Sequence, residues 1–128
     1  MATFYTQVGE ELVTDFTTGD VAAPANYYIG WGTGAVAPAK GSVDVSGPGA
    51  NELRIVAVES QPLADKAQWV ATITCLVGAK TITNAGLWST AGGGPPPAGG
   101  VLLIHGDHAG VALAVGDKIE YTITLEQT

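Results

Sequence analysis

A chain of 128 residues is long enough for one hydrophobic core and too short for two. Hydrophobic residues make up 46% of the chain and charged residues only 13%, against about a quarter in most soluble domains, so we expect a surface rich in Thr, Ser, Asn and Gly or one partly covered by neighbouring molecules. The chain has five scattered basic residues and twelve acidic ones, for a net charge of −7. This charge argues against nucleic acid and membranes as partners.

The first residues predict an extended N-terminal arm over residues 1–8, without the basic start and apolar stretch of a signal peptide. No apolar run approaches the roughly 20 residues that span a bilayer. The one cysteine, Cys75, cannot form a disulfide within the chain. We therefore expect a protein that is made and folded in a cytoplasm.

Beyond the arm, two short segments could form a helical turn or two: Gly9–Phe16, where Leu12 and Val13 share a face with Phe16, and Pro62–Lys66. Elsewhere Gly and Pro interrupt the chain too often for ordinary helices. The intervals between them have the β-branched, aromatic or alternating pattern of strands. The expected strands are Tyr27–Trp31, Leu53–Glu59, Trp69–Val77, Thr81–Ser89, Val101–Ile104 and Lys118–Glu126.

The clearest strand is the last one, in which Ile119, Tyr121, Ile123 and Leu125 alternate with polar residues. Trp69–Val77 alternates less strictly, which predicts a central strand or one whose outer face is covered. The tract at residues 91–100 combines glycines with Pro95, Pro96 and Pro97, which predicts an exposed loop. Together these elements predict a single all-β domain over residues 1–128, an antiparallel β-sandwich or barrel-like fold with long Gly/Pro loops.

The sharpest candidate for chemistry is the segment His105-Gly106-Asp107-His108, because imidazole and carboxylate groups bind zinc and similar ions. The chain has no further histidine, and three ligands from one cramped segment are hard to arrange. We therefore favour a polar turn between two strands and predict neither a metal nor a cofactor. The lone Cys75 lies on the apolar face of its expected strand, where a buried small residue is favoured over a nucleophile.

The segment Gly30–Gly34 lacks the spacing of a dinucleotide or phosphate-binding loop. It predicts a turn that needs positive φ or close backbone approach. No nucleophile elbow or convincing carboxylate pair is present, so the sequence does not indicate an enzyme.

The aromatic residues are candidates for contact rather than chemistry. Trp69 and Tyr121 are in phase with apolar neighbours and are expected in the core. Tyr28, Trp31 and Trp88 are less determined, and core or protein-interface contact is favoured over a sugar-stacking platform.

Three segments together are similar to a pattern found in small structural proteins of tailed-bacteriophage virions: Tyr27–Gly34, Ile82–Trp88 and Val115–Leu125. The related pattern more often has an acidic residue and a Phe where this chain has Asn84 and Trp88. The resemblance implies a β-sandwich virion subunit, with a capsid decoration (cement) protein as the first expectation.

Such a subunit would bind the major capsid protein on the outer surface of the head, stabilise the capsid, and associate with itself as a homotrimer. A tail-fibre or baseplate component with a glycan-binding role is the alternative, and an enzyme is a more distant one. We expect contacts with the capsid or neighbouring copies from the N-terminal arm, the Gly/Pro loop and the less determined aromatic residues. The predicted contact residues are Phe4, Tyr5, Tyr28, Trp31, Trp88, Pro95, Pro96 and Pro97.

Overall fold

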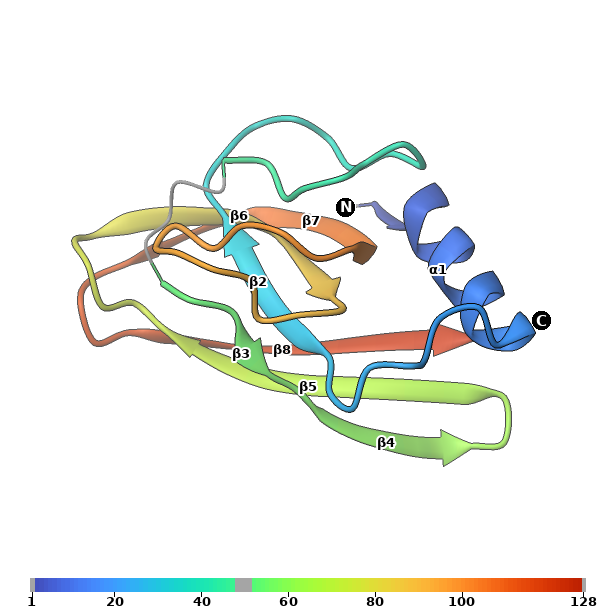
Figure 1. Ribbon diagram of the computed structural model, residues 1–128. Helices are drawn as coiled ribbons and strands as arrows, with labels where there is room; N and C mark the ends of the chain where they lie inside the picture. The colour runs from blue at the N-terminus through green and yellow to red at the C-terminus, as the bar shows by residue number, and fades with distance from the viewer. Residues whose placement is uncertain (1, 48–51, 128) are drawn as a thin grey trace.

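The computed structural model describes residues 2–47 and 52–127, which form one helix and eight strands (Figure 1). The elements are β1 (Thr3–Tyr5), α1 (Gln7–Thr18), β2 (Tyr28–Gly32), β3 (Ile55–Val56), β4 (Val58–Leu63), β5 (Lys66–Thr74), β6 (Lys80–Trp88), β7 (Leu102–Leu113) and β8 (Lys118–Glu126). One sheet has five strands in the order β1-β7-β6-β2-β3, and the other has three in the order β4-β5-β8. All pairs are antiparallel, which confirms the predicted all-β, sandwich-like domain.

The core lies between the two sheets and follows the period-2 alternation of the strands. Ile29, Ile73, Ile82 and Leu87 are almost fully buried there, and each such side chain stabilises the fold by about 1.5–3 kcal/mol relative to an exposed one. Cys75 is also buried and free, as its position predicted. The alternating side chains of β8 pack against this core as partly buried residues.

β5 is the central strand of the three-stranded sheet, as its less strict alternation predicted. It pairs with β8 over nine residues without interruption, from Lys66 opposite Glu126 to Thr74 opposite Lys118. Its other edge pairs with β4. The predicted helical turn at Pro62–Lys66 is wrong, because this segment contains the end of β4, the two-residue turn at Ala64 and Asp65, and the start of β5.

Helix α1 is longer than the turn or two predicted at Gly9–Phe16. The Thr6 hydroxyl caps it by accepting a hydrogen bond from the Gly9 N–H at 3.0 Å. Gly19 ends it with φ of 80°, a conformation that favours glycine. With the capping threonine and the terminal glycine as its ends, the helix extends two residues beyond the predicted segment on each side.

The predicted extended arm at residues 1–8 is instead part of the domain over its described residues, 2–8. β1 pairs with β7, with Thr3 opposite Gly106 and Tyr5 opposite Ile104. The backbone of Ala2 exchanges hydrogen bonds with Asp107, and α1 begins at Gln7. Pairing with β7 satisfies the backbone groups that a free arm would leave to water.

A long loop over residues 33–47 covers the outer face of the five-stranded sheet, drawn at the top of Figure 1. Val45 from this loop packs with Tyr28, Trp88 and Leu102 in a second, smaller apolar cluster. The predicted turn at Gly30–Gly34 is wrong for its first three residues, which belong to β2. The predicted close approach is confirmed, because a Cβ on Gly32 would collide with the loop backbone at Ser46.

Candidate interaction surfaces

His105 is a structural side chain buried under the 33–47 loop, at 2% exposure. Its Nε2 lies 2.9 Å from Asn84 Oδ1, and its Nδ1 lies 3.1 Å from Ser42 Oγ. The Asn84 amide also exchanges two hydrogen bonds with the Ser46 backbone. Because Asn84 Oδ1 can only accept, Nε2 carries the proton and Nδ1 accepts from the Ser42 hydroxyl. Burial lowers the pKa of His105, and Asp107 offsets this only in part.

His108 points to the other side of β7 and bridges the two sheets. Its Nε2 lies 2.9 Å from the Tyr121 hydroxyl of β8, and its Nδ1 lies 2.8 Å from the Ala109 carbonyl. Asp107 is bound to the Ala2 N–H. The predicted polar turn at His105–His108 is therefore wrong, because these residues form the middle of β7. Within residues 2–47 and 52–127 no three His, Cys, Asp or Glu side chains are grouped to hold a metal.

Two of the predicted contact residues, Trp31 and Trp88, belong to the core. Trp31 is 3% exposed, and its Nε1 donates to Glu52 Oε1 at 3.3 Å. Trp88 is 2% exposed, and the Arg54 guanidinium carbon lies over it, 3.6 Å from the centre of the Trp88 ring. Both are removed from the predicted contact residues, because a partner cannot reach either ring without rearranging the fold.

Two buried charges, Glu52 and Arg54, hold this region together, and no local sequence signal indicated them. The Glu52 carboxylate accepts from Lys80 Nζ at 2.6 and 2.8 Å and from the Leu76 and Val77 N–H groups at 3.1 and 2.9 Å. Burial raises the pKa of Glu52, but the Lys80 hydrogen bond and the two backbone donors outweigh it, so the net pKa is lowered. Glu52 thereby links the segment before β3 to the β5–β6 connection.

Arg54 anchors the base of the Gly/Pro loop. Its Nη1 donates to the Thr90 and Gly99 carbonyls at 3.1 and 2.8 Å. Within the loop, Gly93 and Ala98 exchange backbone hydrogen bonds of 2.9 and 2.8 Å. Residues 91–100 are exposed except for the half-buried Pro97. Pro95 and Pro96 are thus accessible on a loop whose ends are held in place.

The remaining predicted contact residues lie on β1 and β2. Phe4 is 37% exposed, whereas Tyr5 is half-buried beside Lys40, whose Nζ lies 5.6 Å from the ring centre. Tyr28 is half-buried and stands opposite Trp88 in the β2–β6 register. The structure therefore brings Tyr28 and Trp88 together. Of the accessible residues, Phe4 belongs to β1, whereas Pro95 and Pro96 belong to the Gly/Pro loop.

An exposed group of apolar side chains at one end of the sandwich was missed. Leu76 and Val77 are 65% and 52% exposed in the β5–β6 connection, and Val115 is 61% exposed in the β7–β8 connection. Cys75 and residues 116–117 exchange backbone hydrogen bonds of 2.7 and 2.8 Å, which hold these two connections together. Leu53 is 50% exposed and follows Glu52, which binds the same connection. We call Leu53, Leu76, Val77 and Val115 the apolar tip.

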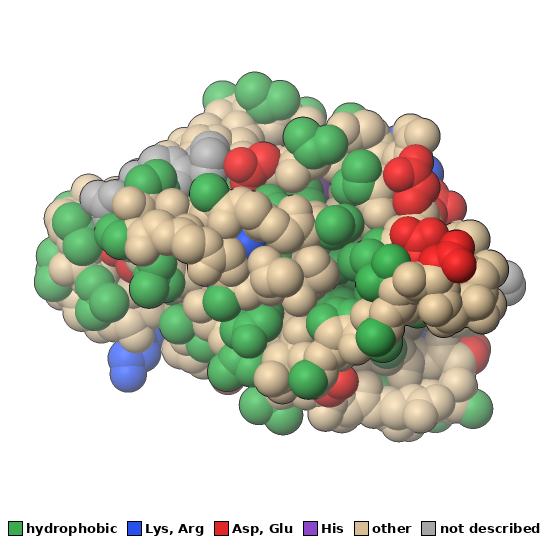
Figure 2. All heavy atoms as spheres, in the orientation of Figure 1, with side chains coloured by type: hydrophobic (Ala, Val, Ile, Leu, Met, Phe, Trp, Pro, Cys, Tyr) green, Lys and Arg blue, Asp and Glu red, His purple; other side chains and the backbone are tan. Residues whose placement is uncertain are grey.

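Figure 2 shows apolar side chains gathered at the end of the molecule where Figure 1 draws these connections, and acidic side chains gathered near α1 at the other end. Large exposed apolar groups indicate an interaction site when they cluster. The sequence signal was a valine beside each turn glycine, in Val77-Gly78 and Val115-Gly116, where polar residues are usual.

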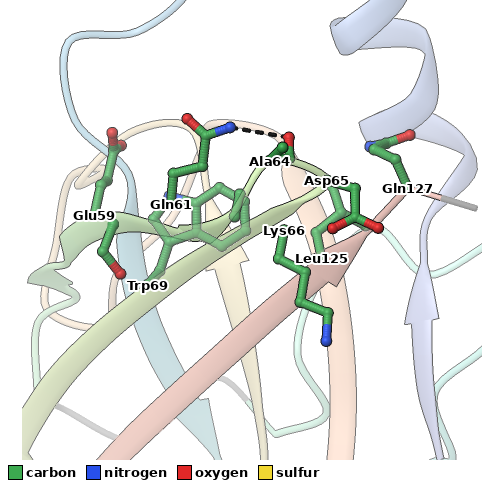
Figure 3. A pocket seen from close by; sticks show the side chains of 10 residues that line it. Glu59, Gln61, Ala64, Asp65, Lys66, Trp69, Leu125 and Gln127 are labelled. Atoms are coloured by element: carbon green, nitrogen blue, oxygen red, sulfur yellow. Dashed lines mark hydrogen bonds between the residues drawn. The ribbon is translucent and has the colours of Figure 1, made fainter.

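A hollow of about 440 Å³ lies between the β4–β5 hairpin and the end of β8 (Figure 3). Polar side chains surround it, including Glu59, Gln61 and Gln127. The Gln61 amide already donates to the Ala64 carbonyl at 3.0 Å. Trp69 is 8% exposed, with its ring packed edge-to-face against Tyr27. The hollow therefore combines polar side chains with apolar ones such as Leu125, and it exposes only the margin of an aromatic ring.

No helix in the described part of the chain is long and apolar enough to cross a membrane. Comparison with known proteins found no protein-family model and no curated protein that matches this chain.

Proposed function

We propose that this chain is a non-enzymatic capsid decoration subunit of a tailed bacteriophage, which binds the outer surface of the head and stabilises it. The three segments that resemble virion proteins form β2, β6 and β8 with its preceding turn. β2 and β6 pair directly, from Tyr28 opposite Trp88 to Gly32 opposite Asn84. The two more distinctive segments are thus one structural unit.

The apolar tip is the observation that supports this function best. Four large apolar side chains are at least half exposed on connections that hydrogen bonds hold together. Burying such side chains against a capsid protein contributes about 25 cal/mol per Å² of apolar surface. The same contact repeated over every copy on a shell gives a large summed stabilisation. The acidic residues near α1 then face away from the contact.

The two histidines and the buried Glu52 do not favour an enzyme. Both imidazoles make hydrogen bonds within the fold, and Glu52 is paired with Lys80. Each group therefore has a structural role, and binding is the mechanism that we propose.

The alternative, a tail-fibre or baseplate component that binds glycan, would use the hollow beside Trp69. Its amide and carboxylate groups suit sugar hydroxyls, but a stacking site needs an exposed aromatic face. Trp69 is 92% buried by packing that includes Tyr27, so it offers little such surface. We therefore favour the capsid over a glycan as the partner.

The test is binding of the purified protein to expanded capsids that lack it. Leu76→Ser with Val115→Ser should abolish decoration while leaving the fold intact, because both side chains are exposed. Val58→Ser is the matched control, since Val58 is 73% exposed on β4 and outside the tip. Equal binding by the tip variant and the control would reject the tip as the contact, and no binding by the unaltered protein would reject the function.

A further inference from the structure

β8 is an edge strand whose outer backbone groups have no partner within residues 2–47 and 52–127. Its nine residues pair with β5 on one side only. Two backbone hydrogen bonds flank the β5–β8 ladder, from Cys75 N to Asp117 O and from Gln127 N to Asp65 O. They show that the odd-numbered residues of β8 direct their backbone N–H and C=O groups toward β5. The even-numbered residues therefore direct their N–H and C=O groups to the open edge. No other described segment pairs with that edge.

The other sheet edges are protected in the ways that proteins usually protect them. β1 has three residues and β3 has two. β4 contains Pro62 and a register shift between Ser60 and Leu63. β8 has neither proline, glycine nor a register shift along its length. A regular strand of nine residues, about 30 Å long, is a template for pairing with another chain.

The interior of the sandwich is also incompletely sealed beside this edge. Tyr121 and Ile123 pack against the core but remain partly exposed. A hollow of about 470 Å³ lies next to them, with Ile104 and Ala85 from the other sheet in its lining. A partner at the β8 edge would cover this apolar lining as well as pair the backbone.

We propose that β8 pairs with β8 of a second copy, antiparallel and about a two-fold axis at Thr122. This register places Lys118 of each copy opposite Glu126 of the other and pairs all nine residues. It also places Glu120 opposite Thr124. If the pairing is shifted by two residues toward the C-terminus, Glu120 lies opposite Glu126 of the other copy. If it is shifted by two residues toward the N-terminus, Glu126 extends beyond the start of the other β8 strand and has no residue of that strand opposite it. Opposite charges directly across a strand pair are stabilising and like charges are not, so the sequence of β8 is self-complementary in one register.

The result is a continuous six-stranded sheet in the order β4-β5-β8-β8-β5-β4. Because the two β8 strands are antiparallel and each begins beside its own apolar tip, the tips lie at opposite ends of the dimer. Two-fold pairing through one edge closes at two copies, so it replaces the homotrimer that the resemblance implied. The pairing does not depend on the proposed capsid function, although two separated tips suit a subunit that bridges neighbouring capsid proteins.

The first test is the mass of the full-length protein by sedimentation equilibrium over a range of concentrations. We expect a monomer–dimer equilibrium, because edge pairing makes a small interface, below about 1,200 Å² in total. Thr122→Pro removes an N–H that faces the open edge and is not used by β5, so it should give a folded monomer. Thr122→Val keeps that N–H and is the matched control, which should remain dimeric. Circular dichroism checks that both variants are folded.

The second test uses charge to read the register. Lys118→Glu and Glu126→Lys should each weaken the dimer alone, because each places like charges opposite one another at both ends. Mixing the two variants in equal amounts should restore dimers, since every facing pair is then opposite in charge. A monomer or trimer for the unaltered protein, a dimer insensitive to Thr122→Pro, or a mixture that stays monomeric would each overturn the proposal.

Discussion

Replacing Lys80 with Met should destabilise the fold strongly, because it leaves the Glu52 carboxylate buried without a positive partner. The Glu52 side chain is 2% exposed and the Lys80 side chain 12%. Breaking a buried ion pair by removing one partner costs about 3–5 kcal/mol. Three donors to Glu52 remain, from Trp31, Leu76 and Val77, so we expect the lower end, about 3 kcal/mol. For a domain of this size that lowers Tm by roughly 10 °C.

The assay is urea unfolding followed by tryptophan fluorescence at neutral pH. Lys40→Met is the control, since its ion pair with Glu10 has side chains that are 56% and 48% exposed, and such pairs contribute about 0–1 kcal/mol. Adding Glu52→Gln to the Lys80 variant should recover part of the lost stability, because no unpaired charge is then buried. Equal losses for the Lys80 and Lys40 variants would refute the reasoning.

Three further predictions concern other parts of the fold. The pKa of His105 is lower in the folded protein than in the unfolded chain, so the contribution of His105 to stability is full above about pH 6.5 and is lost as the pH falls. His105→Gln should therefore reduce the pH dependence of the urea unfolding midpoint between pH 5 and 7.5. Gly32→Ala should cost about 1–3 kcal/mol through collision with the loop backbone, whereas Gly41→Ala, with open space around it, should be nearly neutral in the same assay. Thr6→Ala should cost about 1–2 kcal/mol by removing a buried helix cap, whereas the exposed Thr14→Ala should not lower Tm, and equal effects of the two would count against the cap.

The strands that the sequence predicted well are those in which local pattern and burial agree. β8 alternates strictly because one face packs on the core and the other meets water, so its bounds match the prediction. β6 and β2 were also found, because their β-branched and aromatic residues end at turn signals. In these segments hydrophobic and polar residues alternate because successive side chains of a strand point to opposite faces of the sheet.

Prediction failed where a distant part of the chain decides the environment. The polar segment His105–His108 resembles a turn, yet it continues β7 because Asn84 and the 33–47 loop satisfy His105. Glu52 and Arg54 resemble surface charges, and only the fold brings Lys80 and the Gly/Pro loop to them. The apolar tip depends on connections that are far apart in sequence. Its valines are visible beside turn glycines in the sequence, but only the fold shows that they lie at the same end of the sandwich.

The central claim, that this chain decorates a phage head, is tested most directly by cryo-electron microscopy of virions from the phage that encodes it. We predict density for the β-sandwich on the outer capsid surface, with the apolar tip turned toward the major capsid protein. Density confined to the tail, or no density for this chain in the particle, would contradict the account.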